Sequence, residues 1–276
     1  MQPGIYHKLK VLRDRSVGLF LGNDAGEEVL LPIKYIPEGT DIGDELDVFV
    51  YLDHEDRPVA TTKRPRLTLN GFAPLKVMAM TRFGSFMNWG MEKELLVPFR
   101  EQQDEFDEGK TYVIQLLYDE ESNRLYGTNR IDRQLSNDEL QVKVGDEIEG
   151  LIYRETDLGY LTIVNGTHKG LIYANEVFKP LRVGDRLTAY VKRITDDNKI
   201  DLSVQPIGFK KSNDVNVDTI LTLLIQREGK LDLGDKSAPE DIQNELKMSK
   251  KAFKRAIGSL YKERRITISD HSIQLA

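Results

Sequence analysis

The sequence has 276 residues and no cysteine, which excludes disulfides and thiolate metal sites and predicts a reducing, cytoplasmic location. Hydrophobic residues make up 39% of the chain and charged residues 30%, a composition typical of soluble globular modules. No run of about 20 apolar residues is present, so no contact with a membrane is predicted.

The formal net charge of −6 is distributed unevenly along the chain. Residues 1–63 carry 7 basic and 12 acidic side chains, and residues 69–132 carry 7 and 11. Residues 144–211 are balanced at 10 and 10, and residues 212–276 carry 11 basic and 10 acidic side chains. Because affinity for nucleic acid rests largely on neutralising phosphates, a polyanion site is predicted in the C-terminal half.

Two sets of three glycines indicate an internal repeat. The glycines of each set are separated by 66 and then by 75 residues. The sets are Gly18, Gly84 and Gly159, and Gly43, Gly109 and Gly184. Two landmarks held at constant spacing predict three copies of one small unit.

Each copy predicts five short strands. In the first copy, apolar and polar residues alternate on both sides of Gly18, a short third strand ends at Pro32, and a hairpin turns at residues 54–57. The other copies repeat this order, so the predicted fold is mainly β, with three tandem five-stranded antiparallel barrels. They are module 1 (residues 1–63), module 2 (69–132) and module 3 (144–206). Polar or proline-bearing linkers are predicted at residues 63–69, 133–143 and 206–213.

The periodicity changes from strand to helix after Asp214. Residues 217–225 place apolar side chains at helical spacing, and a short strand follows. The sequence Ser237-Ala-Pro-Glu240 is interpreted as a capping box that opens a second helix. Ser249 is predicted to cap a third helix, which a closing hairpin follows. This order predicts an α+β winged-helix domain at residues 213–276.

The three modules resemble the S1 RNA-binding domain, an OB-fold barrel. Module 3 carries the best matches, Gly170-Leu-Ile-Tyr173, Val183-Gly-Asp185 and Lys199-Ile-Asp-Leu-Ser203. Module 2 has Phe83-Gly-Ser-Phe86, and module 1 keeps Val17-Gly-Leu-Phe20. Oligonucleotides lie across strands 2 and 3 of OB barrels, where rings stack on bases and cations contact the backbone.

The resemblance implies candidate RNA-binding residues in each module. The S1 family has two aromatic positions on strand 2. In module 3 these positions hold Leu158 and Leu161, with Tyr160 between them. The stacking candidates are Phe20, Phe83, Phe86, Tyr160 and Tyr173, and the candidate cations of module 3 are Lys169 and Lys199. Alternatively, the phenylalanines belong to the barrel cores.

Three further side chains have two interpretations each. Arg57 and Arg124 occupy the family's arginine position, but the acidic turns around them favour local ion pairs. Trp89, the single tryptophan, either stacks on a base or packs against the neighbouring module.

The third predicted helix and the residues on either side of it carry a cluster of basic side chains. Residues 247–265 hold eight basic side chains and one acidic side chain, Glu263. Because this helix contacts nucleic acid in many winged-helix and helix-turn-helix domains, backbone contact is predicted here. The candidates are Lys250, Lys251, Lys254, Arg255, Lys262, Arg264 and Arg265.

Three S1-like barrels followed by a winged helix resemble the conserved virulence factor B family of bacterial RNA-binding proteins. The resemblance implies an RNA-binding protein that acts in post-transcriptional regulation of gene expression, including virulence factors. The charge distribution and the candidate residues predict that it binds single-stranded RNA mainly through module 3 and the winged helix. No catalysis, metal or cofactor is expected, because the four histidines have no paired metal-ligand spacing and no glycine-rich phosphate loop is present.

Two other functions stay open from the sequence. The acidic modules 1 and 2 are suited to binding a protein partner, which would make the protein an adaptor. The winged helix is suited to leading a DNA-binding regulator.

Overall fold

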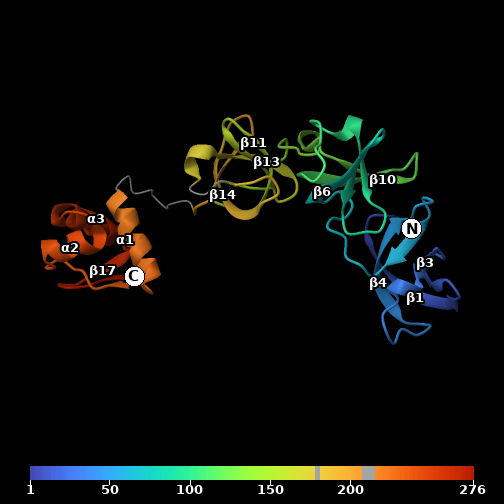
Figure 1. Ribbon diagram of the computed structural model, residues 1–276, viewed down its shortest axis with the longest axis horizontal. Helices are drawn as coiled ribbons and strands as arrows, with labels where there is room; N and C mark the ends of the chain where they lie inside the picture. Colours follow the sequence, from blue (N-terminus) through green and yellow to red (C-terminus); the bar gives the residue numbers. More distant parts are fainter. Residues whose placement is uncertain (178–180, 207–214) are drawn as a thin grey trace. The chain divides into compact units, whose positions relative to one another are not determined.

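The computed structural model describes residues 1–177, 181–206 and 215–276, and the chain divides into two compact units, Met1–Ile207 and Gly208–Ala276 (Figure 1). From residue 207 on, the predicted linker at residues 206–213 lies outside the described residues. No helix in the described ranges is long and apolar enough to cross a membrane.

Module 1 is a closed barrel with strand order β1-β2-β3-β5-β4. Its strands are β1 (Tyr6–Arg15), β2 (Gly18–Gly22), β3 (Glu28–Pro32), β4 (Glu45–Leu52) and β5 (Pro58–Thr61). Parallel pairing of Leu30 with Val59 closes the barrel. Alternation along the strands buries Leu9, Val11, Leu21 and Leu31 in its core.

Module 3 repeats this barrel with strand order β11-β12-β13-β15-β14. Its strands are β11 (Glu147–Thr156), β12 (Gly159–Val164), β13 (His168–Tyr173), β14 (Arg186–Ile194) and β15 (Ile200–Ser203). Three parallel residue pairs between β13 and β15 close it, beginning with Gly170 and Ile200.

Module 2 corrects the prediction of three closed barrels. Its strands are β6 (Phe72–Thr81), β7 (Gly84–Asn88), β8 (Leu95–Pro98), β9 (Thr111–Asp119) and β10 (Arg124–Thr128), in the order β10-β9-β6-β7-β8. At the seam, the Val97 carbonyl accepts a hydrogen bond from the Gln102 side chain at 2.9 Å. Side chains of β8 pack against β10 so closely that a Cβ on Gly127 would lie 2.8 Å from Val97 Cγ2. In module 2, side-chain packing between β8 and β10 therefore takes the place of the parallel strand pairing that closes modules 1 and 3.

The repeated glycines have a steric cause. Gly159 has a φ of +148°, and a Cβ there would lie 2.1 Å from the Ile172 carbonyl oxygen on the facing strand. Gly18 and Gly84 have φ values of +143° and +146° and would meet a carbonyl oxygen at 2.1 and 2.3 Å. Only glycine allows the start of strand 2 to lie this close to the end of strand 3.

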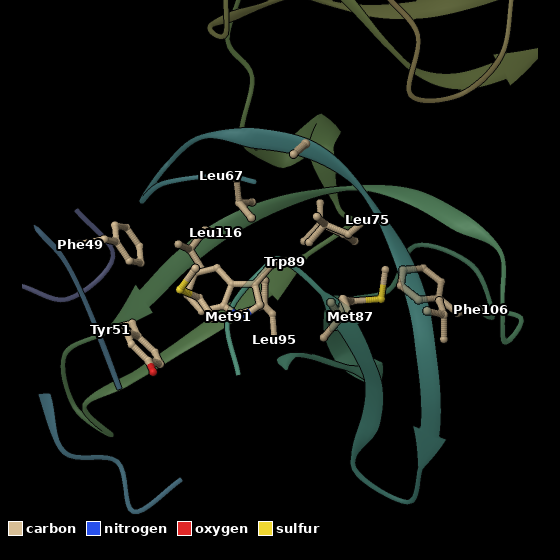
Figure 2. Packing of buried hydrophobic residues seen from close by; sticks show 14 of the residues in the cluster. Phe49, Tyr51, Leu67, Leu75, Met87, Trp89, Met91, Leu95, Phe106 and Leu116 are labelled. Carbon is tan, nitrogen blue, oxygen red and sulfur yellow. The ribbon is translucent and has the colours of Figure 1, made fainter. Parts of the chain in front are cut away.

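The three modules share apolar contacts within the first unit. Trp89 is 3% exposed, and its ring lies 5.9 Å from Phe49 and 6.5 Å from Tyr51, both on β4 of module 1. Figure 2 shows the indole among these rings and Leu116 of module 2. Trp89 Nε1 donates to the Lys93 carbonyl at 2.7 Å. Of the two interpretations of Trp89, packing against the neighbouring module is confirmed.

A second shared cluster joins modules 2 and 3. Phe72, Val113 and Ile131 of module 2 form one buried group with three residues of module 3. Those residues are Leu151, Tyr153 and Ile163. Neither module would keep this surface covered by itself.

The second unit has the predicted winged-helix order. Its elements are α1 (Val215–Gln226), β16 (Lys230–Leu231), α2 (Pro239–Leu246), α3 (Lys250–Lys262), β17 (Ile266–Ile268) and β18 (Ile273–Leu275). The three strands form a sheet in the order β16-β18-β17. Buried residues of all three helices share one core, which includes Ile220, Leu224, Ile242, Phe253 and Ile257.

Two capping predictions had different outcomes. Ser249 is the N-cap of α3, and its hydroxyl accepts from the Ala252 amide at 3.2 Å, as predicted. The capping box at Ser237 is wrong: Ala238 is the N-cap of α2 and makes no side-chain cap. The Ser237 hydroxyl instead accepts from the Gly234 amide at 2.8 Å, so it closes the preceding turn.

Candidate nucleic-acid interface

Module 2 exposes two phenylalanine rings beside a cation. Phe86, in the middle of β7, is half-buried and pairs with Leu96 of β8. Phe83 precedes β7 and is 60% exposed, and the Arg82 guanidinium lies 4.7 Å from its ring centroid. The rings are outside the buried cluster of module 2, so the alternative that they form its core does not hold. A flat ring with a neighbouring cation suits an unstacked base and its phosphate.

Sequence reasoning missed another aromatic at this end of module 2. Gly84 pairs with Pro98, so Phe83 and Phe99 leave β7 and β8 at the same end of the strand pair. Phe99 is 49% exposed. Its position directly after Pro98, at the end of the third strand of the module, was the signal that could have identified it.

In module 1, the one candidate ring is already engaged. Phe20 is half-buried on β2, and the Arg13 guanidinium lies 4.5 Å from its centroid. Arg13 is held by Glu28 through two hydrogen bonds of 2.6 and 2.5 Å. The cation is thus neutralised, and its plane covers a face of the ring.

The structure separates the two candidate tyrosines of module 3, Tyr160 and Tyr173. Tyr160 is 8% exposed and belongs to the barrel core, which corrects its assignment as an exposed stacking residue. Alternation then turns Leu161 outward. Tyr173, at the end of β13, is half-buried on the outer face, together with Lys169 and Leu171. A one-residue uncertainty in facing had placed Tyr160 on the wrong side of the sheet.

Both candidate lysines of module 3 lie against carboxylates. Lys199 is 2.6 Å from Asp197 in the last hairpin. Lys169 is 2.6 Å from Oδ1 of Asp132, in the 3₁₀ turn η3 (Ile131–Arg133) at the end of module 2. The exposed Lys199–Asp197 pair costs little to open, so a phosphate can compete for Lys199.

Asp132 collects three donors from module 3. Tyr153 Oη donates to it at 2.9 Å and Arg154 Nη1 at 2.9 Å, in addition to Lys169. Burial raises the pKa of the Asp132 carboxyl, but hydrogen bonds from Lys169 and Tyr153 and the nearby positive charges outweigh it. The pKa of Asp132 therefore lies below its ordinary value of 3.8.

Both hairpin arginines make ion pairs, but only Arg57 makes the predicted local one. Arg57 Nη2 donates to Asp53 at 2.8 Å within the same turn. Arg124 Nε of module 2 donates to Asp56 of module 1 at 3.3 Å, and Lys93 also contacts Asp56 at 2.5 Å. The last hairpin of module 1 is therefore part of the joint between modules 1 and 2.

The α3 helix has a cationic outer face in the winged-helix unit. Phe253, Ala256, Ile257 and Leu260 are buried. The exposed cations of this segment are Lys251, Lys254, Arg255, Lys262 and Arg264, while Lys250 and Arg265 are half-buried. Lys254 contacts Asp235 at 3.0 Å and Arg265 contacts Glu263 at 3.6 Å. Tyr261, 58% exposed, adds a ring to this face.

The structure also brings together a pair of residues that sequence reasoning missed. Asp201 of β15 lies under the outer face of module 3 and pairs with Arg193 of β14. The register of these strands shifts between Val191 and Arg193. No local sequence signal shows that shift, so the pair could not be found from the sequence.

Comparisons with known proteins identify two of the domains. Residues 3–63 match the S1 domain, and residues 218–275 match the CvfB-like winged helix domain. Among solved structures, a multidomain protein with nucleic acid binding domains from Streptococcus pneumoniae TIGR4 aligns with 99% of this chain and 98% of its own, at 23% identity and a TM-score of 0.47.

Similarity to other proteins extends over most of the chain. The uncharacterized protein YitL of Bacillus subtilis is 28% identical over 275 residues, which are 96% of this chain and 91% of YitL. Conserved virulence factor B of Staphylococcus saprophyticus is 29% identical over 262 residues, 91% of this chain and 86% of that protein. Conserved virulence factor B of Staphylococcus aureus USA300 is 27% identical and covers 85% of this chain. The chain thus combines an S1 domain with a CvfB-like winged helix domain, and over most of its length it is similar to proteins named conserved virulence factor B.

Proposed function

We propose that the protein binds single-stranded RNA in the cytoplasm, without catalysis, and takes part in post-transcriptional regulation of gene expression. The observation that carries this proposal is the outer face of α3, where Lys251, Lys254 and Lys262 are exposed opposite a fully buried apolar stripe. Such a face offers several charges to phosphates and few groups suited to reading base edges. It favours backbone contact without sequence preference.

The outer faces of the S1-like modules favour single strands over duplexes. Phe83, Phe86 and Tyr173 present rings on or beside strands 2 and 3, where OB-fold barrels bind oligonucleotides. A ring can stack only on a base that has left its own helix. The balanced charge of module 3 and the basic α3 face support main RNA contacts in module 3 and the winged helix, with the rings of module 2 as further contacts.

The test is a charge reversal on α3 in the full chain. Lys251→Glu, Lys254→Glu and Lys262→Glu together are expected to weaken binding to all single-stranded RNA sequences alike. Each lost phosphate contact should reduce the slope of log K against log salt by about 0.7. Fluorescence anisotropy of a labelled RNA at several salt concentrations measures both quantities. The full chain is needed because removing module 2 would expose Leu151, Tyr153 and Ile163.

A matched control reverses three exposed cations of module 1. Lys8→Glu, Lys10→Glu and Arg15→Glu change the net charge equally, on a module that carries more acid than base. The proposal predicts a much smaller loss of affinity for this control. Equal losses in both triple variants would contradict a specific role for α3.

A protein partner on module 2 is a second candidate function. Module 2 carries 7 basic and 11 acidic side chains, a net charge of 7 − 11 = −4, yet it exposes Phe83, Phe99 and two methionines. Aromatic and methionine side chains are enriched in protein interfaces, and acidic surfaces repel RNA. Phe83→Ala separates the two functions: under this candidate it leaves RNA affinity unchanged and abolishes co-purification of a stoichiometric partner.

A further inference from the structure

A buried carboxylate lies beneath the outer face of module 3. Asp201 is 7% exposed. Arg193 of β14 contacts its Oδ2, with Nε at 2.8 Å and Nη2 at 2.7 Å. The Tyr173 hydroxyl of β13 donates to its Oδ1 at 3.3 Å. The two oxygens of one carboxylate therefore hold a ring and a guanidinium from different strands.

The barrel register places all three side chains on one face. Asp201 pairs with Leu171 on one side and with Arg193 on the other. Tyr173 lies two residues beyond Leu171 on β13, so it faces outward as Leu171 does. This is the outer face of strand 3, across which the bases of RNA are proposed to lie.

The surroundings of Asp201 point to more than a structural contact. An acid on a polyanion-binding face repels phosphates, and burying its charge is costly unless donors surround it. The Arg193 side chain is nevertheless 63% exposed, with its Nε and Nη2 edge toward Asp201 and the rest of the guanidinium toward solvent. Hydrogen bonds and charge from Asp201 raise the pKa of Arg193 above its ordinary value.

We infer that Asp201 is a positioning residue that fixes Tyr173 and Arg193 as a subsite for one nucleotide of single-stranded RNA. The Tyr173 ring stacks on the base, and the outer edge of the Arg193 guanidinium contacts the adjacent phosphate. Fixing both groups before binding reduces the entropy that they lose when RNA arrives. This inference rests on the proposed function, and it adds Arg193 and Asp201 to the residues that the S1 resemblance implies.

The decisive variant is Asp201→Asn, because electrostatics and positioning predict opposite signs. Removing an acid from an RNA-binding face should strengthen binding if charge alone matters. Loss of positioning should weaken binding, by about three- to tenfold for the charge-assisted hydrogen bonds involved. The control is Asp196→Asn, which makes the same charge change at an exposed carboxylate of the same module. It should leave affinity unchanged or slightly higher.

Two further variants keep the test decisive if Asp201→Asn fails to fold. Tyr173→Phe keeps the ring and removes only the hydroxyl that contacts Asp201, so a several-fold loss of affinity is expected with an unchanged salt slope. Arg193→Gln is at a mostly exposed side chain, and it should lower the salt slope by about 0.7, the value for one phosphate of a single strand. Circular dichroism melting confirms folding of each variant.

The measurement is anisotropy of a labelled oligouridylate of about a dozen nucleotides, within the range that one OB-fold module contacts. If the wild-type chain does not bind it, the proposed function and this inference both fail. If the wild type binds, and folded Asp201→Asn and Tyr173→Phe bind equally well or better, this inference alone is wrong. Weaker binding by both, with no loss in Asp196→Asn, supports it.

Discussion

The Lys169 ammonium lies 2.6 Å from Oδ1 of Asp132, although the two residues belong to different modules. Lys169 is on β13 of module 3, and Asp132 is in the 3₁₀ turn η3 at the end of module 2. A cation that the sequence assigns to RNA thus also holds a joint. Arg154 and Tyr153 donate to the same carboxylate, so Asp132 is the polar centre of the contact between modules 2 and 3.

Asp132→Asn should loosen this joint and change its pH dependence. The folded-state pKa of Asp132 is below 3.8, so its stabilising contribution is fully present above that value and is lost as the pH falls through the folded pKa. We expect the variant to lose about 1–3 kcal/mol at neutral pH, the cost of removing charge-assisted hydrogen bonds at a partly buried site. Denaturant melts at pH 7 and in steps below pH 4 check this.

The wild type should lose stability over that acidic interval by more than the variant does. Asp107→Asn is a suitable control, because this exposed carboxylate also has a lowered pKa but contacts Lys110 within one turn. Identical acid melts for wild type and Asp132→Asn would show that the joint does not depend on this charge.

Trp89→Ala should weaken the joint between modules 1 and 2. The indole is 3% exposed between Phe49 and the core of module 2, and replacing a buried tryptophan with alanine costs about 3–5 kcal/mol. Trp89→Phe should recover part of that loss. RNA affinity, measured at a temperature where the variant is folded, should stay close to wild type. A stable variant with strongly reduced RNA affinity would instead assign the indole to base stacking.

Phe83→Ala and Phe99→Ala test whether the end of module 2 stacks on bases. Each is expected to cost about 1–3 kcal/mol of RNA binding if its ring holds one base. Val17→Ala is the matched control, because Val17 stands at the position of Phe83 in module 1 and is 55% exposed. Isothermal titration with one RNA gives the three values. If all three substitutions leave RNA affinity nearly unchanged, RNA does not contact this end of module 2.

Gly258→Ala separates stability from binding on α3. A Cβ at Gly258 would have no neighbour within 4 Å, so no packing requires glycine there. Alanine in place of a mid-helix glycine should stabilise the winged helix by about 0.5–1 kcal/mol. If RNA lies against the helix backbone beside Lys254 and Tyr261, the same methyl should lower RNA affinity. A higher melting temperature with unchanged affinity would place the RNA elsewhere on the helix.

The modules and the winged helix could be predicted because their signals are local. Gly18, Gly84 and Gly159 mark a strand approach that only glycine permits, so their spacing shows the repeat directly. The apolar residues Phe253, Ala256, Ile257 and Leu260 of α3 recur at helical spacing, and all four are buried. Such signals depend on backbone geometry and periodicity, which a short window of sequence contains.

The site depends on relationships that no short window contains. Tyr160 faces the barrel core and Tyr173 faces outward, because side chains alternate between the two faces of a strand. An error of one residue in the strand register therefore exchanges a core residue for a surface residue. Asp201 meets Arg193 only through a shifted register, and Asp132 meets Lys169 only through the packing of two modules. The first contact depends on an irregularity in a hairpin and the second is long-range in the sequence, so composition and spacing encode neither.

The central claim is that rings on the S1-like faces and cations on α3 bind a single polynucleotide strand. The most direct test is competition between single-stranded RNA and duplex DNA of the same length for the full chain, at a fixed salt concentration. The account predicts that single-stranded RNA displaces the labelled probe at a much lower concentration than duplex DNA. Equal or better displacement by duplex DNA would contradict it.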